Sequence, residues 1–353
     1  MKWLLFIVPL LLISLLAAIW GGWLRMGWDL PYTAMAVQHG SLMVNAFLAS
    51  LIFLERAVTF RSRWVLLLPF VNAFSLICYA SGNPEAAMIC TIAGSSGFVI
   101  MCAYFVWKYK ELYYYIFLLG AACLLTGNLF LFSSSLYAGA VQWWMGFLLF
   151  TIVAERIELS RFLSLKPYQV RLLLAALALV TVSFLLPGNA GSILFAAGLT
   201  ATAAWLLRFD MARHAVRREG SHRYSGILLI AGYIWLPVTA AALLFRDYLP
   251  FYYDAVLHSF FIGFVFSMIF SHAPIILPAV ARLPIRIYRP FLYFPFCLLQ
   301  LTLMMRIWGD VSGNVVLRKW GGMGNGLSIL LFFITIAVIV GSALQARRRQ
   351  LKA

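Results

Sequence analysis

Two histidines within apolar segments are the residues of this sequence best suited to hold a metal. His39 and His258 each lie eight residues beyond a proline, Pro31 and Pro250, in long hydrophobic runs. A helix rises 1.5 Å per residue, so if both runs start at the same membrane face, both imidazoles lie roughly 12 Å below it. Two imidazoles at one depth on two spanning helices can supply both axial ligands of a haem iron.

Few other histidines compete for this role. The chain has five, of which His214 and His222 lie in a basic segment and His272 lies in the same apolar run as His258. A copper or other metal site is one alternative to haem for His39 and His258. The other is a structural role, in which each imidazole hydrogen-bonds to a neighbouring helix.

His272 is interpreted separately, because it is fourteen residues beyond His258. On an ideal helix this is about 21 Å, too far for one metal centre. We expect a structural pairing with Glu55 or Glu155, with a second cofactor ligand or a proton relay as alternatives. The two glutamates are each followed by an arginine where a span emerges, which predicts a clamp of ion pairs between helices.

Other residues could help to hold a haem. Arg25, Arg306 and Arg318 lie on the outer side by position, so they are the candidates for binding propionates. Gly40 follows His39 directly, and Gly263 follows His258 by five residues. Both glycines would let a flat macrocycle or a neighbouring helix approach closely.

The composition is that of a membrane protein. Hydrophobic residues make up 64% of the chain and charged residues only 11%, and the mean hydropathy is +0.93, which excludes an ordinary soluble domain. We predict twelve spans, at 3-23, 32-54, 64-82, 85-107, 112-133, 136-154, 170-188, 190-207, 224-245, 249-272, 285-306 and 324-345. The predicted fold is an all-α, polytopic helical bundle, with residues 1-353 forming one integral membrane domain.

Basic residues predict the orientation. With both termini in the cytoplasm, 22 of the 27 Lys and Arg residues fall on that side, as the positive-inside rule requires. The net charge of +16 follows from this bias. Because the charges are spread over short loops, we expect anionic lipid headgroups as their partners and exclude nucleic acid.

Cysteines and a glycine-rich segment show no catalytic pattern. The five cysteines lie in apolar runs without a CxxC spacing, which predicts buried packing thiols. Segment 320-326 is rich in glycine but lacks the preceding strand and the GK[ST] ending of a phosphate loop. We expect it to be a flexible entry to the last span.

Three spans end in related patterns. These are Phe47-x-x-Ser50-x-Ile52-Phe53, Phe147-x-x-Phe150-x-Ile152-Val153 and Phe264-x-x-Ser267-x-Ile269-Phe270. They recur every fourth span, as a pseudo-threefold arrangement of three four-helix units would require. Chance similarity is the alternative, and under this alignment His39 and His258 differ in register by two residues.

Twelve spans with histidines on the second and tenth resemble the catalytic subunit I of haem-copper oxidases. In those proteins, twelve helices form three arcs, and histidines of the second and tenth helices hold a low-spin haem. His39 and His258 match these two positions by helix number and depth. The resemblance covers the topology of the whole chain and, by motif, only these few positions.

The oxygen-reducing centre of the oxidases has no counterpart. Val256 and Phe260 flank His258 where the oxidases carry a second histidine, and segments 136-154 and 170-188 contain no histidine for a copper ion. The resemblance therefore implies a haem without the haem-copper centre that reduces oxygen.

A second resemblance is to the NnrS family, twelve-helix membrane haem proteins linked to nitric oxide. Its helix-ten pattern is similar to HSFFIGF at 258-264 with His272 beyond it, and its early histidine-bearing helix is similar to HGSLM at 39-43. This resemblance implies haem b, a place in the bacterial inner membrane, and a role in nitric oxide response or in electron transfer with a redox protein or quinone. It implies no defined reaction, and a multipass transporter or permease without haem is the alternative.

Overall fold

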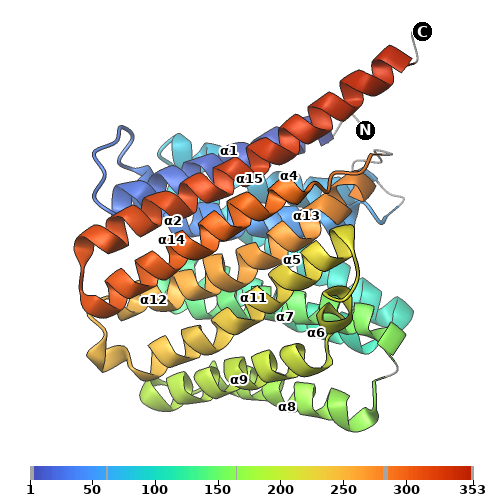
Figure 1. Ribbon diagram of the computed structural model, residues 1–353. Coiled ribbons are helices and arrows are strands. Elements are labelled where there is room, and N and C mark those ends of the chain that lie inside the picture. The colour runs from blue at the N-terminus through green and yellow to red at the C-terminus, as the bar shows by residue number, and fades with distance from the viewer. Residues whose placement is uncertain (1–3, 61–62, 164, 281–284, 351–353) are drawn as a thin grey trace. The chain divides into compact units, whose positions relative to one another are not determined.

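The protein is mainly helical in the part of the chain that its computed structural model describes, residues 4–60, 63–163, 165–280 and 285–350. No strand occurs in these residues. In lipid, a helix is favoured because it satisfies its own backbone hydrogen bonds, which apolar side chains cannot do. The predicted all-α class is confirmed (Figure 1).

Ten helical segments among the described residues are long and apolar enough to cross a membrane. They are Ile7–Arg25, Met35–Ala57, Pro84–Tyr109, Leu112–Ser134, Tyr137–Ser160, Gly188–Phe209, Gly220–Leu244, Tyr252–Pro278, Pro290–Ser312 and Val315–Ala346. The predicted spans 64-82 and 170-188 correspond to shorter apolar helices, Trp64–Ala80 and Pro167–Ser183. The chain is a multi-pass membrane protein, with ten spans supported by length and composition.

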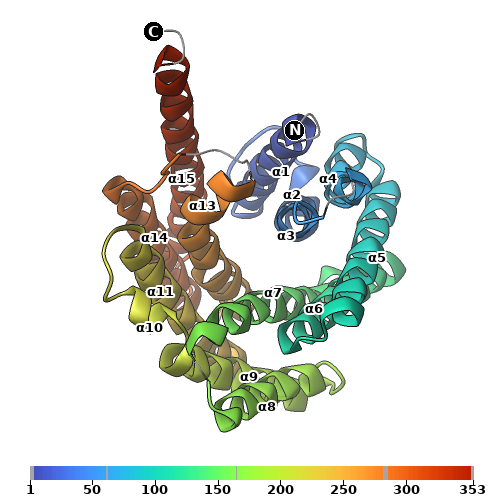
Figure 2. The same ribbon diagram turned by 90° about the vertical axis from the view of Figure 1, so that its right-hand side faces the viewer.

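The chain forms two compact units, Met1–Glu158 and Leu159–Ala353. The helices that start in unit 1 are α1 (Leu4–Arg25), α2 (Met35–Ser41), η1 (Leu42–Ala49), α3 (Ser50–Ala57), η2 (Arg63–Leu66), α4 (Leu67–Ala80), α5 (Pro84–Tyr109), α6 (Leu112–Ser134) and α7 (Tyr137–Ser160). Helix α1 packs on α2 and η1, and α5 packs on both α4 and α6 (Figure 2). Stacked aromatic rings fill part of this core, with Phe53 and Phe98 centred 4.3 Å apart.

Unit 2 contains the remaining helices. They are η3 (Arg161–Leu163), α8 (Pro167–Ser183), α9 (Gly188–Phe209), α10 (Ala212–Ala215), α11 (Gly220–Leu244), η4 (Arg246–Tyr248), α12 (Tyr252–His258), η5 (Ser259–Phe266), α13 (Ser267–Val280), η6 (Pro290–Leu292), α14 (Tyr293–Ser312) and α15 (Val315–Gln350). Helix α9 packs between α8 and α11, α11 packs on η5 and α13, and α14 runs beside α15 (Figure 1).

The glycine-rich segment 320-326 lies inside α15, so the prediction of a flexible entry there is wrong. A Cβ atom on Gly321 would collide with the backbone of Arg306, and one on Gly324 would collide with the side chain of Thr302. These glycines therefore let α15 approach α14 closely. In a membrane, such small residues mark helix contacts rather than chain breaks.

Both helices that carry the candidate histidines change to π-helix for eight residues. Segment η1 continues α2 without a break, and η5 continues α12 in the same way. π-Helical turns are rare and occur frequently at functional sites. The two segments end directly before Ser50 and Ser267, at equivalent positions of the related sequence patterns. The third pattern lies in α7, which is α-helical.

Polar side chains support the wider turns of both segments. In η1 the carbonyl oxygen of Asn45 accepts hydrogen bonds from Asn72 Nδ2 at 2.6 Å and from Ser50 Oγ at 3.2 Å. In η5 the carbonyl oxygen of Gly263 accepts one from Ser267 Oγ at 2.6 Å. An amide from the following helix also donates to each serine, Asn72 to Ser50 and Gln300 to Ser267.

Candidate functional site

His39 is held by α1. Its Nδ1 lies 2.6 Å from the carbonyl oxygen of Ala18, and since a carbonyl only accepts, Nδ1 carries the proton and Nε2 carries the lone pair. Gly22 lies against the ring, because a Cβ atom on Gly22 would be 2.9 Å from Cε1 of His39. The position and the tautomer of this imidazole are therefore set by α1.

His258 has the same tautomer. Its Nδ1 lies 2.9 Å from the carbonyl oxygen of Asp254, one turn earlier on α12, and 3.3 Å from the Oδ1 of that residue. The side chain is 15% exposed. No described residue hydrogen-bonds to Nε2, so this nitrogen has its lone pair available.

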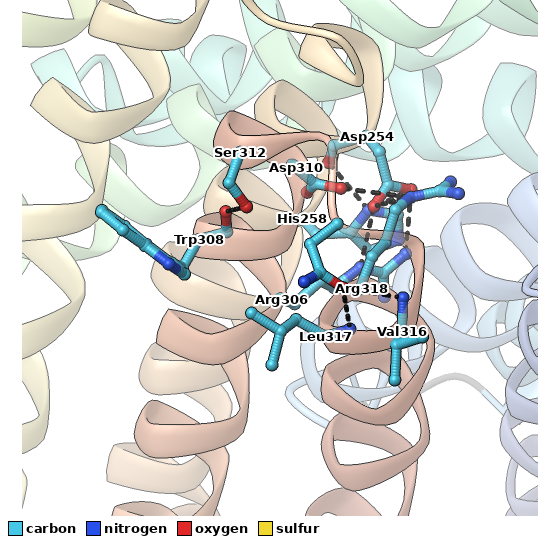
Figure 3. A network of polar contacts seen from close by, with 10 residues as sticks. Asp254, His258, Arg306, Trp308, Asp310, Ser312, Val316, Leu317 and Arg318 are labelled. Atoms are coloured by element: carbon cyan, nitrogen blue, oxygen red, sulfur yellow. Dashed lines mark hydrogen bonds and ion pairs between the residues drawn. The ribbon is translucent and has the colours of Figure 1, made fainter.

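Asp254 is the centre of a cluster of charges (Figure 3). Arg306 of α14 donates to both carboxylate oxygens, with Nε 2.9 Å from Oδ2 and Nη2 2.9 Å from Oδ1. Arg318 of α15 donates from Nε to Oδ2 at 3.3 Å. A two-pronged guanidinium contact of this kind is strong and directional, so the cluster ties α12 to α14 and α15.

Asp310 completes this charged cluster. Its Oδ1 lies 3.1 Å from Nε of Arg318, and its side chain is fully buried. The guanidinium of Arg318 also stacks on the ring of Phe251, 4.5 Å from its centroid. The four formal charges of Asp254, Arg306, Asp310 and Arg318 balance, which is how ionised groups are tolerated within a span.

The predicted propionate-binding residues lie in different surroundings. Arg25 ends α1 and is exposed, whereas Arg306 is 6% exposed and paired with Asp254.

The sequence analysis overlooked both Asp254 and Asp310. A signal was present, because Asp254 precedes His258 by four residues and Asp310 follows Arg306 by four, the spacing that places side chains on one helix face.

His272 lies in α13 and is half-buried. The eight π-helical residues of η5 stand between it and His258. The ideal α-helical rise used above for the distance between the two histidines therefore does not apply along this segment.

The predicted ion-pair clamp is confirmed in unit 1. Arg56 of α3 contacts Glu155 of α7 at 2.6 Å. Glu55 and Glu158 lie further from the same guanidinium, at 3.7 and 3.8 Å. The guanidinium also covers the ring of Phe117, 4.3 Å from its centroid. One arginine thus joins three helices.

The two glycines near the histidines contact neighbouring helices. A Cβ atom on Gly40 would meet the ring of Tyr137 at 3.3 Å, and one on Gly263 would collide with the ring of Trp235. Of the two predicted roles for these glycines, the structure supports close helix approach.

The structure also tests the predicted burial of the cysteine thiols and shows which side chains gather as metal ligands. Cys102 and Cys123 are buried, Cys78 and Cys90 are half-buried, and Cys297 is exposed, so the prediction of buried thiols holds for two of the five. In the described part of the chain, no three His, Cys, Asp or Glu side chains gather as a group that could hold a metal ion. An axial haem site takes fewer protein ligands, two imidazoles.

Comparison with known proteins identifies the chain at the level of its family. No curated protein and no solved structure matches it. The family described as domain of unknown function (DUF8744) matches residues 4–341, nearly the whole sequence, and the chain therefore belongs to this family.

Proposed function

We propose that the protein binds haem b in the membrane, with Nε2 of His39 and Nε2 of His258 as axial ligands. The observation that carries this proposal is the shared tautomer, since both imidazoles direct Nδ1 to a carbonyl oxygen. A histidine that ligates a metal almost always donates its other ring N–H in this way. This orientation of both rings supports the proposal.

The protein residues have distinct tasks in this proposal. Ala18 and Gly22 orient the ring of His39, and Asp254 orients the ring of His258. Arg25, which is exposed, is the propionate candidate that the charged cluster leaves available. Arg306 already gives two N–H groups to Asp254, which makes it the weaker propionate candidate.

When bound, haem b would supply one-electron chemistry. We propose a role in nitric oxide response or in respiratory electron transfer with a quinone or a redox protein, in the bacterial inner membrane. The absence of histidine from the segments 136-154 and 170-188 supports a protein without a haem-copper centre for oxygen reduction. Copper bound by His39 or His258 is the other metal to test.

The proposed haem is tested with the wild-type protein. The chain, purified from cells supplied with haem, should show a reduced-minus-oxidised band in the α region of the visible spectrum. Metal analysis of the same sample should find iron rather than copper. A colourless preparation without iron would contradict the proposal.

We propose that all twelve predicted segments span, with both termini in the cytoplasm and three four-helix units. The positive-inside bias supports this topology. Helices Trp64–Ala80 and Pro167–Ser183, of 17 residues each, are at the lower limit of spanning length. Reporter fusions after residues 110, 165 and 220 should be cytoplasmic, and those after 83, 189 and 247 external. A cytoplasmic reporter at 83 or 189 would mean that one of these helices does not cross.

The second candidate function is transport without haem. The π-helical segments and the charged cluster around Asp254 favour it, because transporters commonly place irregular helices and paired charges within the membrane. The same visible spectrum separates the two candidates. A transporter would purify without colour and keep its fold.

A further inference from the structure

Asp310 is a buried carboxylate that the proposed haem ligation does not use. It lies in the last turn of α14, with a side chain that is 0% exposed. No described residue donates a hydrogen bond to either of its carboxylate oxygens. A buried polar group without such a bond is costly, and an ionised one more so.

Four ionisable side chains of the described chain face this region: Asp254 and His258 from α12, Arg306 from α14, and Arg318 from α15. Asp254 receives two N–H groups from Arg306 and one from Arg318. His258 also contacts Asp254.

Two opposing effects therefore act on Asp310. Arg318 attracts its ionised form, since Nε lies 3.1 Å from Oδ1. Burial without hydrogen bonds disfavours the ionised form. A protonated Asp310 would be neutral and would gain an O–H donor. Nε of Arg318 lies within 3.3 Å of a carboxylate oxygen of Asp254 and of Asp310, so both carboxyl groups face the same guanidinium.

We propose that Asp310 is a proton-binding site of this membrane protein. A proton from hydronium forms an O–H bond on one carboxylate oxygen and water is released, with no change in electron count. Arg318, whose side chain is 22% exposed, connects the site to the surface. The site serves proton exchange within the span, whether the protein carries haem or transports a solute.

Infrared difference spectroscopy tests the proposal directly. The full chain in lipid nanodiscs is stepped between acidic and alkaline pH, with and without aspartate labelled with ¹³C at the carboxyl carbon. The label restricts the signal to Asp29, Asp210, Asp247, Asp254 and Asp310. The expected result is a carbonyl stretch of a protonated carboxyl that appears reversibly with pH and moves on labelling. This readout needs no haem, so its result is independent of the haem proposal.

Two variants assign the band. Asp310→Asn should remove it, and Asp310→Glu, which keeps a carboxyl group, should leave a band that no longer responds to the aspartate label. Asp247→Asn is the matched control, because Asp247 is 78% exposed and belongs to the same unit, and it should leave the band unchanged. Absence of any label-sensitive band from the wild type, or its persistence in both Asp310 variants, would overturn the proposal.

Discussion

The helix that carries His39 and the helix that carries His258 each continue into a π-helical segment of their own. The two histidines nevertheless have different neighbours. His39 contacts a carbonyl oxygen of Ala18 and the surface of Gly22. Around His258 stands a network of ions centred on Asp254. Because a carbonyl oxygen fixes the tautomer of both rings, the ions of unit 2 are not needed for it. Their separate tasks are to hold three helices together and to provide the proton site.

The largest expected effect comes from removing the centre of that network. Asp254→Ala removes the carboxylate to which buried Arg306 donates two hydrogen bonds, which should lower the free energy of unfolding by about 3 to 5 kcal/mol. Denaturant titration in detergent would measure this loss. Asp247→Ala, at an exposed carboxylate, is the control and should change stability by less than about 0.5 kcal/mol. A loss below about 1 kcal/mol for Asp254→Ala would mean that the ions do not join the helices.

At His39 we expect a smaller loss of stability, caused by steric crowding. Gly22→Ala places a methyl group 2.9 Å from Cε1 of His39, so the ring must move, at a cost of about 1 to 3 kcal/mol. Gly139→Ala is the matched control in the same unit, because a Cβ atom there meets nothing within 4 Å. It should be neutral or stabilising by up to about 1 kcal/mol. Equal effects of the two substitutions on thermal stability would show that α1 does not confine His39.

The smallest effects compare the two π-helical segments directly. Ser50→Ala and Ser267→Ala each remove one hydroxyl that accepts from an amide and donates to a carbonyl. Each substitution should cost about 1 kcal/mol. Similar losses of thermal stability would support the view that the same hydrogen-bonding arrangement stabilises the π-helical segment of each unit. A loss at only one serine would show that the two π-helical segments are stabilised by different interactions, although their sequence patterns are related.

The sequence predicted the helical class, the helix positions and the clamp at Arg56, because composition and charge placement determine these features. The π-helical segments were not predictable, since the residues of η1 and η5 are as apolar as those of any span. The pairing of Asp254 with Arg306 was not predictable either, because the two residues are 52 positions apart in the sequence. The glycines of segment 320-326 resembled a chain break, although helix contact in lipid requires the same small residues.

Axial ligation by His39 and His258 is the central claim, and the visible spectra of three alanine variants test it most directly. His39→Ala and His258→Ala should each abolish the six-coordinate, low-spin signature, because loss of either ligand opens a coordination position. His272→Ala should keep that signature, because His272 is not one of the two ligands. If His272→Ala removes the signature while His39→Ala leaves it intact, the assignment of His39 and His258 is wrong.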